Sequence, residues 1–238
     1  MSVSVLIPTY NAANDLLTTL LCLRNQTVRN FDVLVIDGAS TDKTAEIVAQ
    51  FKDVITTYLS EKDNGVYDAM NKGLLLLRTP YYVVLGAGDY FYPHAIQIFD
   101  EAVCNTGADI VVAPVVTDGK ELSPMRGKLW RRGASGLMAH HAVGTLIKRT
   151  LHDEFGCYSQ DFKYLSDSFF ILQVYRAKKV FHEIIESVGV YAGGGMSAQH
   201  RFRTSFEMYA IEHRLGGYSI VQVVLLAFRF LKFSIKRS

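Results

Sequence analysis

Strand-like and helix-like segments alternate through the first half of this chain. Short runs rich in aliphatic and aromatic residues predict buried strands, and the segments between them carry apolar residues at helical spacing. This order is typical of an α/β protein with a mostly parallel sheet and helices on both faces. The predicted strands are residues 3–7, 31–36, 55–59, 81–85 and 109–113, and the predicted helices are 14–23, 41–51, 66–77 and 93–103.

The composition supports a folded core. Of the 238 residues, 49% are hydrophobic and 20% are charged, which excludes an intrinsically disordered chain. Cys22, Cys104 and Cys157 show no C-x-x-C spacing, so we expect neither a zinc knuckle nor a disulfide scaffold, and a reducing cytoplasmic compartment fits best. We expect no signal peptide, and no apolar run reaches the ~18 residues needed to span a bilayer.

After the fifth predicted strand the alternation weakens. Residues 117–136 are rich in Gly, Lys and Arg and predict an irregular segment. Residues 145–148 predict a short strand and residues 166–176 a helix. Two terminal helices are expected at 206–214 and 220–236.

Positive charge gathers at the C-terminal end. Residues 201–238 hold seven basic and two acidic residues, a net of +5, whereas the first 200 residues hold 18 basic and 21 acidic residues, a net of −3. Such asymmetry predicts an anionic partner, either a membrane surface or a nucleic acid. On a helix, residues 218–238 form one narrow polar stripe on an apolar surface, which suits a membrane interface and argues against nucleic acid. A helix packed on the domain or on a second copy is the alternative.

Polar loops follow four of the predicted strands. They are residues 9–11, 37–40, 61–64 and 86–89. Because ligands of open α/β sheets bind beyond the carboxyl ends of the strands, we expect these loops to form one binding site. The chain has no G-x-G-x-x-G after its first strand, no G-x-x-x-x-G-K-[ST] and no G-x-S-x-G, which excludes the common dinucleotide, P-loop and hydrolase sites.

Three acidic positions have both a structural and a functional interpretation. Asp37 ends a strand, where it can bind a ribose hydroxyl or a base N–H, or can form a turn or a helix cap. Asp68 and Lys72 lie four residues apart on a helix, either as a surface ion pair or beside a nucleotide with Lys72 facing phosphate. Asp89 follows a strand in a Gly-rich turn, as a turn residue or as a ligand of a cation that bridges a diphosphate.

The second half of the chain offers further candidates. Asp167 begins a helix, where a carboxylate stabilises the N-terminus or acts as a general base. His140 and His141 can serve one site only if the backbone there is irregular, because adjacent residues of a strand face opposite ways. The histidines form no cluster with metal-ligand spacing. The basic residues around Trp130 predict a solvated loop, a phosphate contact or a membrane contact.

Four segments taken together resemble family 2 glycosyltransferases, which have the GT-A fold. They are residues 5–11 (VLIPTYN), 35–44 (VIDGASTDKT), 60–73 (SEKDNGVYDAMNKG) and 85–93 (LGAGDYFYP), in the order and spacing of that family. The third segment is most similar to bacterial exopolysaccharide, colanic-acid-type and O-antigen enzymes. Weaker resemblance continues through HHAVGTLIKR, FKYLSDSFF and GGGMS.

The resemblance implies a nucleotide-sugar donor, with UDP as the expected nucleotide, and a divalent cation, Mn²⁺ or Mg²⁺. Asp167 matches the catalytic base of the family, and Asp89 matches the end of its acidic metal-binding motif. His141, Arg131 and Arg132 are candidates for contacts with the acceptor or with a phosphate. The matched donor-binding residues are Pro8, Thr9, Tyr10, Asn11, Asp37, Asp68, Asn71 and Lys72.

The same resemblance divides the chain. Residues 1–115 are expected to bind the donor, residues 116–200 to form the acceptor-binding and catalytic half of the same GT-A domain, and residues 201–238 to form basic amphipathic helices that contact the membrane surface. Residues 86–89 read Gly-Ala-Gly-Asp, where many relatives carry a fuller D-x-D motif. With Asp89 as the single acidic ligand, we expect weak metal binding in the absence of donor.

The implied reaction is a single displacement that inverts the anomeric carbon, with Asp167 removing the proton of the acceptor hydroxyl. The implied acceptor is a glycan or a polyprenyl-diphosphate-linked sugar of a bacterial cell-surface polysaccharide, at the inner face of the cell membrane. A nucleotidyltransferase is one alternative, but residues 9–15 (TYNAAND) offer no Gly-rich basic loop for a triphosphate. A catalytically degraded sugar-nucleotide-binding subunit is the other, with Gly86 and Gly88 marking a lost metal site.

Overall fold

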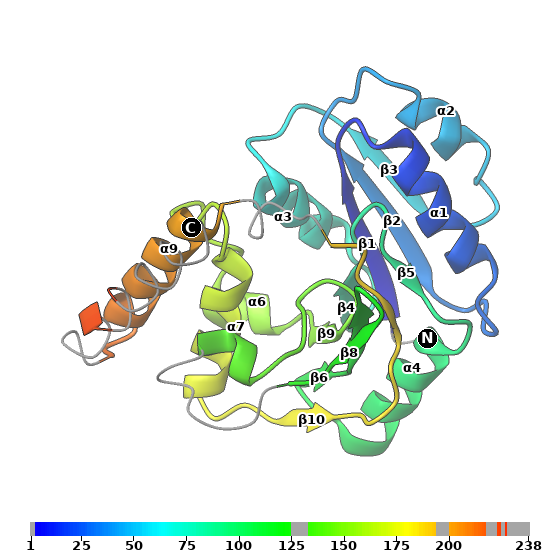
Figure 1. Ribbon diagram of the computed structural model, residues 1–238. Helices are drawn as coiled ribbons and strands as arrows, with labels where there is room; N and C mark the ends of the chain where they lie inside the picture. The colour runs from blue at the N-terminus through cyan, green and yellow to red at the C-terminus, as the bar shows by residue number, and fades with distance from the viewer. Residues whose placement is uncertain (1–2, 125–132, 194–199, 218–222, 225–226, 228–238) are drawn as a thin grey trace.

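A mixed seven-stranded sheet forms the centre of the computed structural model, which describes residues 3–124, 133–193, 200–217, 223–224 and 227 (Figure 1). Its strand order is β10-β6-β9-β4-β1-β2-β3, and all neighbours are parallel except β9, which runs antiparallel to both β4 and β6. The expected α/β class with a mostly parallel sheet is therefore confirmed. The strands are β1 (Val3–Thr9), β2 (Asp32–Asp37), β3 (Thr57–Ser60), β4 (Tyr81–Val84), β6 (Ile110–Val112), β9 (Thr145–Lys148) and β10 (Phe181–Glu183).

Helices cover both faces of this sheet (Figure 1). One face buries Val5 and Ile7 of β1, and the opposite face buries Leu6, because successive side chains of a strand alternate. All three side chains are fully buried. Because β1 is buried on both faces, its sequence is a continuous apolar run through these residues. The first face is covered by α1 (Ala13–Arg24), α2 (Thr44–Ala49) and α4 (Ala95–Thr106), and the second by α3 (Val66–Leu76), α6 (Leu151–Phe155) and α7 (Ser166–Arg176).

Helix α3 lies unusually close to the sheet at Gly73. A Cβ atom at this position would overlap the side chain of Leu6 and would lie 3.2 Å from Cγ1 of Ile36. The missing side chain thus sets the distance between α3 and strands β1 and β2. This packing holds the N-terminus of α3 beside the carboxyl ends of those strands.

A second, four-stranded sheet corrects one expectation from the sequence. Residues 117–136 were expected to be irregular, but β7 (Val115–Thr117) and β8 (Lys120–Leu122) form a hairpin. Its two turn residues, Asp118 and Gly119, have φ angles of 49° and 69°. An Asp-Gly pair is favoured in such two-residue turns because both positions need a left-handed backbone. The other strands of this sheet are β5 (Tyr90–Phe91) and β11 (Gly189–Val190).

Several predicted boundaries shift by a few residues. Helix α2 begins at Thr44 rather than at residue 41, because the Asp42 carboxylate accepts the N–H groups of Thr44 (2.9 Å) and Ala13 (3.1 Å) ahead of the helix. Helix α4 continues to Thr106, three residues beyond the expected end, and stops at Gly107, whose φ of 61° suits glycine. The predicted helix 166–176 coincides with α7.

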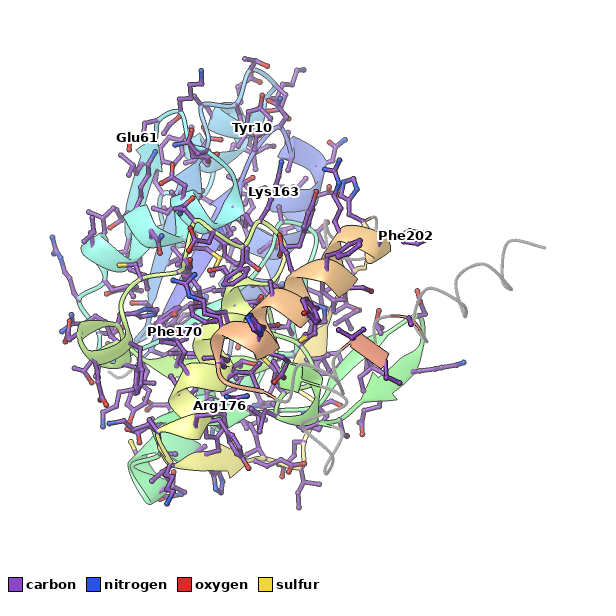
Figure 2. All side chains as sticks on the ribbon, turned by 90° about the vertical axis from the view of Figure 1, so that its left-hand side faces the viewer. Tyr10, Glu61, Lys163, Phe170, Arg176 and Phe202 are labelled. Atoms are coloured by element: carbon purple, nitrogen blue, oxygen red, sulfur yellow. The ribbon has the colours of Figure 1, made fainter. Side chains whose placement is uncertain are left out.

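Helix α9 (Arg201–Arg214) packs its residue Ile211 into the core beside α7. Figure 2 shows Lys163 toward the end of α9 that carries Phe202 and Arg176 toward its opposite end. None of the helices among the described residues combines the length and the hydrophobicity that crossing a bilayer requires. The expected interfacial segment 218–238 lies outside the described residues, apart from positions 223–224 and 227.

Candidate active site

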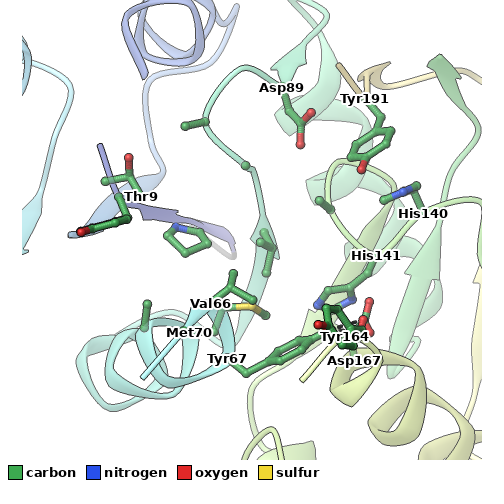
Figure 3. A pocket seen from close by; sticks show the side chains of 18 of the residues that line it. Thr9, Val66, Tyr67, Met70, Asp89, His140, His141, Tyr164, Asp167 and Tyr191 are labelled. Atoms are coloured by element: carbon green, nitrogen blue, oxygen red, sulfur yellow. Dashed lines mark hydrogen bonds between the residues drawn. The ribbon is translucent and has the colours of Figure 1, made fainter. Parts of the chain in front are cut away.

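A cleft of about 450 Å³ opens at the carboxyl ends of β1 and β4 (Figure 3). Its walls come from the loops after these strands, from α3, from the segment before β9 and from the start of α7. Six of the predicted site residues line it, which are Pro8, Thr9, Tyr10, Asp89, His141 and Asp167. Residues from both the expected donor half and the expected acceptor half therefore meet in one cavity.

Asp89 is a buried carboxylate at one end of this cleft. Its side chain is 5% exposed, and its Oδ1 accepts the N–H of Ala192 at 2.8 Å. The hydroxyl of Thr19 fixes the turn, because it accepts the N–H of Gly88 (3.0 Å) and donates to the Asp89 carbonyl (2.7 Å). Burial raises the pKa of Asp89 to about 6. This buried acid has no ion-pair partner among the described residues.

The donor set at Asp89 fits a cation that takes most of its ligands from elsewhere. No group of three or more His, Cys, Asp or Glu side chains able to hold a metal occurs in the part of the chain that the structure describes. One uncompensated carboxylate suits Mg²⁺ or Mn²⁺, which keep several waters and bind substrate phosphates alongside one or two carboxylates. Gly88, next to Asp89 in this turn, has a φ of +96°, a left-handed backbone conformation that favours glycine.

Asp167 lies at the first turn of α7, across the cleft from Asp89 (Figure 3). Its Oδ1 accepts hydrogen bonds from the Tyr67 hydroxyl (2.8 Å) and from the N–H of Ser168 (2.7 Å). Among the described residues, no group hydrogen-bonds the other oxygen, Oδ2. Burial and the nearby Asp167 raise the pKa of Tyr67, so the tyrosine stays a hydrogen-bond donor. Asp167 is thus held by one oxygen and has the second available for a substrate.

Helix α9 supports the segment that precedes Asp167. The carboxylate of Glu207 accepts three consecutive backbone N–H groups, those of Lys163 (2.8 Å), Tyr164 (2.8 Å) and Leu165 (2.9 Å). These donors lie just ahead of α7, where backbone N–H groups lack helical partners. The sequence does not predict this contact, because Glu207 is more than 40 residues away along the chain.

His140 and His141 both reach the cleft, because the backbone between η1 (Gly133–Gly136) and β9 is not a strand. The ring of His140 stacks on Tyr191 with 3.7 Å between the ring centroids. Nε2 of His141 lies 3.0 Å from the Tyr158 hydroxyl. Burial lowers the pKa of both histidines, that of His140 to about 4, so both are neutral at pH 7.

Asp37 and Asn11 do not line the cleft but organise the loops beside it. Asp37 is 1% exposed, and its carboxylate accepts hydrogen bonds from Ser40, from the Ser60 hydroxyl (2.6 Å) and from the Tyr58 hydroxyl (3.3 Å). The side-chain oxygen of Asn11 accepts a backbone N–H at 2.8 Å from the loop that follows β2. Both residues therefore hold the carboxyl ends of β1 and β2 in place.

The structure does not bring Asp68, Asn71 and Lys72 into the cleft. Lys72 pairs with Glu61 (3.0 Å) and Asp68 (3.8 Å) and donates to the carbonyl of Lys62 (2.7 Å), which matches the ion-pair interpretation. The carboxamide of Asn71 bonds both backbone groups of a residue in the segment after α6, at 2.8 and 2.9 Å. Arg131 and Arg132 lie outside the described residues.

Other side chains of the cleft were not expected from the sequence. Lys163 is the single lysine or arginine among its described lining residues. Tyr67 lies in the family-like segment 60–73, one residue before Asp68. Its position in that segment is the sequence feature that could have predicted Tyr67 as a cleft residue. The side chains that were not predicted are Tyr67, Lys163, Tyr164 and Tyr191, whereas Asp63 belongs to the expected polar loop 61–64 and His140 was considered together with His141.

The model of a known family, described as glycosyl transferase family 2, matches residues 4–173 of this sequence. The chain belongs to glycosyl transferase family 2. The matched range includes both Asp89 and Asp167, and thus the two ends of the cleft.

Curated relatives are bacterial glycosyltransferases. The chain is 37% identical over 102 residues to the amylovoran biosynthesis glycosyltransferase AmsB of Erwinia amylovora, which covers 41% of this chain and 34% of that protein. It is 38% identical over 92 residues to a PGL/p-HBAD biosynthesis glycosyltransferase of Mycobacterium bovis, which covers 37% of this chain and 36% of that protein. The matches thus span about a third of the length of these relatives.

Solved structures with the same fold cover nearly the whole chain. S. aureus TarS 1–349 in complex with UDP aligns with a TM-score of 0.72 at 16% identity, over 97% of this chain and 71% of that one. The mannosyltransferase PcManGT from Pyrobaculum calidifontis, in complex with GDP-Man and Mn²⁺, aligns with a TM-score of 0.71 at 19% identity, over 96% of this chain and 69% of that one. The expected GT-A fold is confirmed.

Proposed function

We propose that this family member transfers a sugar from a nucleoside-diphosphate donor to a hydroxyl of a saccharide or polyprenyl-diphosphate-linked acceptor. The observation that carries the proposal is the pair of acids across one cleft, Asp89 at the end suited to a cation and Asp167 with a free oxygen at the other end (Figure 3). Transfer needs a charged leaving group at one end and a nucleophile at the other. Asp89 suits a cation that offsets the charge of the leaving group, and Asp167 suits removal of the proton from the nucleophile.

Asp167 is the proposed general base. Its free Oδ2 takes the proton of the acceptor hydroxyl while that oxygen attacks the anomeric carbon, and the bond to the diphosphate oxygen breaks on the opposite side. One displacement inverts the configuration and needs no covalent intermediate. The hydrogen bonds from Tyr67 and Ser168 fix the carboxylate, so little reorganisation is needed before the proton moves.

Asp89 is the proposed metal ligand. When bound, a divalent cation offsets the charge that develops on the leaving diphosphate. Lys163 also lines the cleft and is proposed to contact a bound phosphate, whereas Lys72 is engaged by Glu61 and Asp68. Because Asp89 is a single ligand, we expect metal and donor to bind together rather than in sequence.

UDP is the proposed donor nucleotide, with support from the UDP and UDP-GlcNAc complexes of the structural neighbour TarS. Its ribose and base are proposed to lie against Thr9 and Tyr10, beside the loop that Asp37 orders. The acceptor proposal draws on the names of the curated relatives, which concern bacterial polysaccharide and glycolipid biosynthesis. Association with the inner membrane face through residues 218–238 is proposed from the basic amphipathic pattern of that segment.

A thermal-shift panel tests the donor proposal. UDP, GDP, dTDP and CMP are each added with and without Mn²⁺. A ligand at a hundredfold excess over its Kd stabilises the native state by about 2.7 kcal/mol, which is a rise in Tm of roughly 5–10 °C for a domain of this size. We expect UDP with Mn²⁺ to give the largest rise. Stabilisation by none of the four would contradict a nucleotide-sugar site, and stabilisation without turnover of any UDP-sugar would favour the degraded binder.

A further inference from the structure

A buried chain of hydrogen bonds runs from the cleft to helix α6. Nε2 of His141 lies 3.0 Å from the hydroxyl of Tyr158, which lies 2.6 Å from the hydroxyl of Tyr82. That hydroxyl lies 2.7 Å from Nε2 of His152. Nδ1 of His152 in turn lies 2.9 Å from the carbonyl oxygen of Gly156. Tyr82, Tyr158 and His141 are buried, and their network is not used by the mechanism above.

The carbonyl of Gly156 fixes which atoms of this hydrogen-bond network donate and which accept. A carbonyl oxygen only accepts, so Nδ1 of His152 carries the proton of this bond. Burial lowers the pKa of His152 to about 4, so the ring is neutral at pH 7 and its Nε2 has a lone pair and no proton. The Tyr82 hydroxyl must therefore donate to Nε2 of His152, because two lone pairs at 2.7 Å would repel.

Each hydroxyl has one proton to donate, so fixing the donor in one hydrogen bond of the network fixes the donor in the next. Tyr82 gives its proton to His152, and Tyr158 must then donate to the Tyr82 oxygen. With the Tyr158 proton used, Nε2 of His141 must donate to the Tyr158 oxygen. The neutral ring of His141 then holds its one proton on Nε2, and Nδ1 has a bare lone pair.

This lone pair has no partner within the described residues, although Nδ1 is buried. Buried polar atoms without a partner are rare, because each costs the free energy of its lost hydration. His141 lines the cleft, and Figure 3 shows its ring beside Asp167. The carboxylate of Asp167 and Nδ1 of His141 are both hydrogen-bond acceptors, so this end of the cleft suits a ligand that brings a hydroxyl proton.

We propose that His141 accepts a hydrogen bond through Nδ1 from a hydroxyl of the bound sugar, and that Tyr158, Tyr82 and His152 are positioning residues that lock this tautomer. A phosphate oxygen is excluded as the partner, because the imidazole has no proton left to donate. The identity of the ligand as a sugar rests on the proposed function, whereas the tautomer does not. The hydroxyl belongs either to the donor sugar or to the acceptor.

Nuclear magnetic resonance of ¹⁵N-labelled histidine measures the tautomer in the free protein. We expect Nδ1 of His141 to give the shift of an unprotonated nitrogen at pH 7 and Nε2 that of a protonated one. The variant His141→Gln removes the signal and so assigns it. The variant Tyr158→Phe should give a mixture of both tautomers, since the lock is removed while His141 stays. A wild-type ring protonated on Nδ1, or on both nitrogens, would overturn the proposal.

The same signal identifies the source of the hydroxyl. A shift of Nδ1 on adding UDP-glucose, UDP-galactose or UDP-N-acetylglucosamine with Mn²⁺, but not on adding UDP with Mn²⁺, assigns it to the donor sugar. A shift only when free N-acetylglucosamine is added to the UDP complex assigns it to the acceptor. An unshifted Nδ1 in complexes whose formation is seen as a rise in Tm would refute the hydroxyl contact. Absence of any nucleotide binding would instead refute the proposed function and leave the tautomer result standing.

Kinetics separate the ligand contact from a structural role. His141→Ala should lower kcat/KM by about tenfold to a hundredfold, the range for losing one buried hydrogen bond. Tyr158→Phe should lower it by only about twofold to fivefold, because part of the His141 population keeps the correct tautomer. Equal losses in the two variants, with equal loss of Tm, would show a purely structural role and contradict the proposal.

Discussion

At the scale of single residues, Asp89 combines burial with a charge that the described residues do not compensate. Its pKa of about 6 lies above the value of 3.8 for an ordinary aspartate. The folded state therefore holds the proton more tightly than the unfolded state, so the fold loses stability as the pH rises from about 4 to about 6, and the penalty is full above about pH 6. A bound cation removes this penalty, so the destabilising charge and the affinity for a cation have the same cause.

The pKa of Asp89 predicts how donor binding depends on pH. The protonated carboxyl cannot bind a cation, so binding of a UDP-sugar with Mn²⁺ should be full above about pH 7 and should weaken by roughly tenfold per pH unit below pH 6. Calorimetric Kd values between pH 5 and pH 8 measure this. A UDP-sugar is used because its diphosphate, unlike the terminal phosphate of UDP, has no group that titrates near pH 6.

The variant Asp89→Asn is the matched control for this pH series. It keeps the size of the side chain and an acceptor for the N–H of Ala192, but it has no proton to lose. Its weak residual binding should be independent of pH over the same range. A wild-type Kd that stays constant from pH 5 to pH 8 would contradict the role of Asp89 as metal ligand.

Site residues marked by a local sequence pattern could be predicted, whereas site residues placed by contacts with distant segments could not. The sequence placed Asp89 after a strand and Asp167 at the start of a helix, and the structure finds both in the cleft. Lys163 carries no local signal for its place in the cleft. The helical period of α3 specifies the pair of Lys72 with Asp68, but it does not specify the contacts that Lys72 makes with Glu61 and Asn71 makes with the segment after α6.

At the scale of elements, α9 holds the start of α7 through Glu207. Charge-assisted hydrogen bonds to a carboxylate stabilise by about 1.5–3 kcal/mol each, and Glu207 accepts three of them. The variant Glu207→Gln replaces one acceptor oxygen by an amino group that faces N–H donors. We expect a lower Tm and a kcat reduced by about tenfold or more, with a nearly unchanged KM for donor, because Asp167 shifts while the donor end of the cleft does not.

Glu212 offers a matched control on the same helix. Its carboxylate pairs with Arg176 at 3.0 Å, at the far end of α7 from Asp167. Glu212→Gln should lower Tm with little change in kcat, when both are measured beside the wild type. If Glu207→Gln and Glu212→Gln changed kcat equally, α9 would contribute to stability alone.

The close approach of α3 to the sheet gives a second prediction at this scale. An alanine in place of a helical glycine normally stabilises by about 1 kcal/mol, whereas forcing an extra carbon into a packed core costs about 1–3 kcal/mol. At Gly73 the added Cβ would overlap Leu6, so we expect Gly73→Ala to lower the free energy of unfolding by up to about 2 kcal/mol. Urea denaturation measures this, with the exposed Leu75→Ala as control, and an unchanged or higher stability would contradict the packing.

Elements with a local signal were predictable, and elements defined by their pairing were not. The Asp118-Gly119 turn and the stop at Gly107 carry local signals, because Asp-Gly favours a two-residue turn and glycine favours the left-handed end of a helix. Strands β5 and β11 are two residues long and exist only because distant segments pair with them. Nothing in such short runs separates a strand from a loop.

At the scale of the whole molecule, the placement of β9 between β4 and β6 joins the two halves of the cleft. β9 pairs antiparallel with both strands, and the segment that precedes it carries His140 and His141 to the carboxyl ends of the parallel strands. The βα alternation predicted a mostly parallel sheet. It could not predict this reversed strand, because strand order depends on contacts between segments more than 60 residues apart.

The proposed membrane contact predicts how the full chain partitions. Each of the four basic residues in 218–238 is expected to contribute about 1 kcal/mol at an anionic surface. We expect the full chain to sediment with phosphatidylglycerol vesicles and to be released at high salt, and a chain lacking residues 218–238 to stay in the supernatant. Equal partitioning of the two chains would contradict the membrane contact.

The central claim is that Asp167 takes the proton of the acceptor, and the variant Asp167→Asn tests it most directly. Its turnover of a UDP-sugar with Mn²⁺ should fall by about 10²–10⁴-fold. Its apparent Kd for the donor with Mn²⁺, obtained from the rise in Tm, should stay within about twofold of the wild-type Kd. The variant Asp161→Asn, at an exposed position that pairs with Arg214, serves as control and should turn over normally. Turnover of Asp167→Asn near the wild-type rate would contradict the claim.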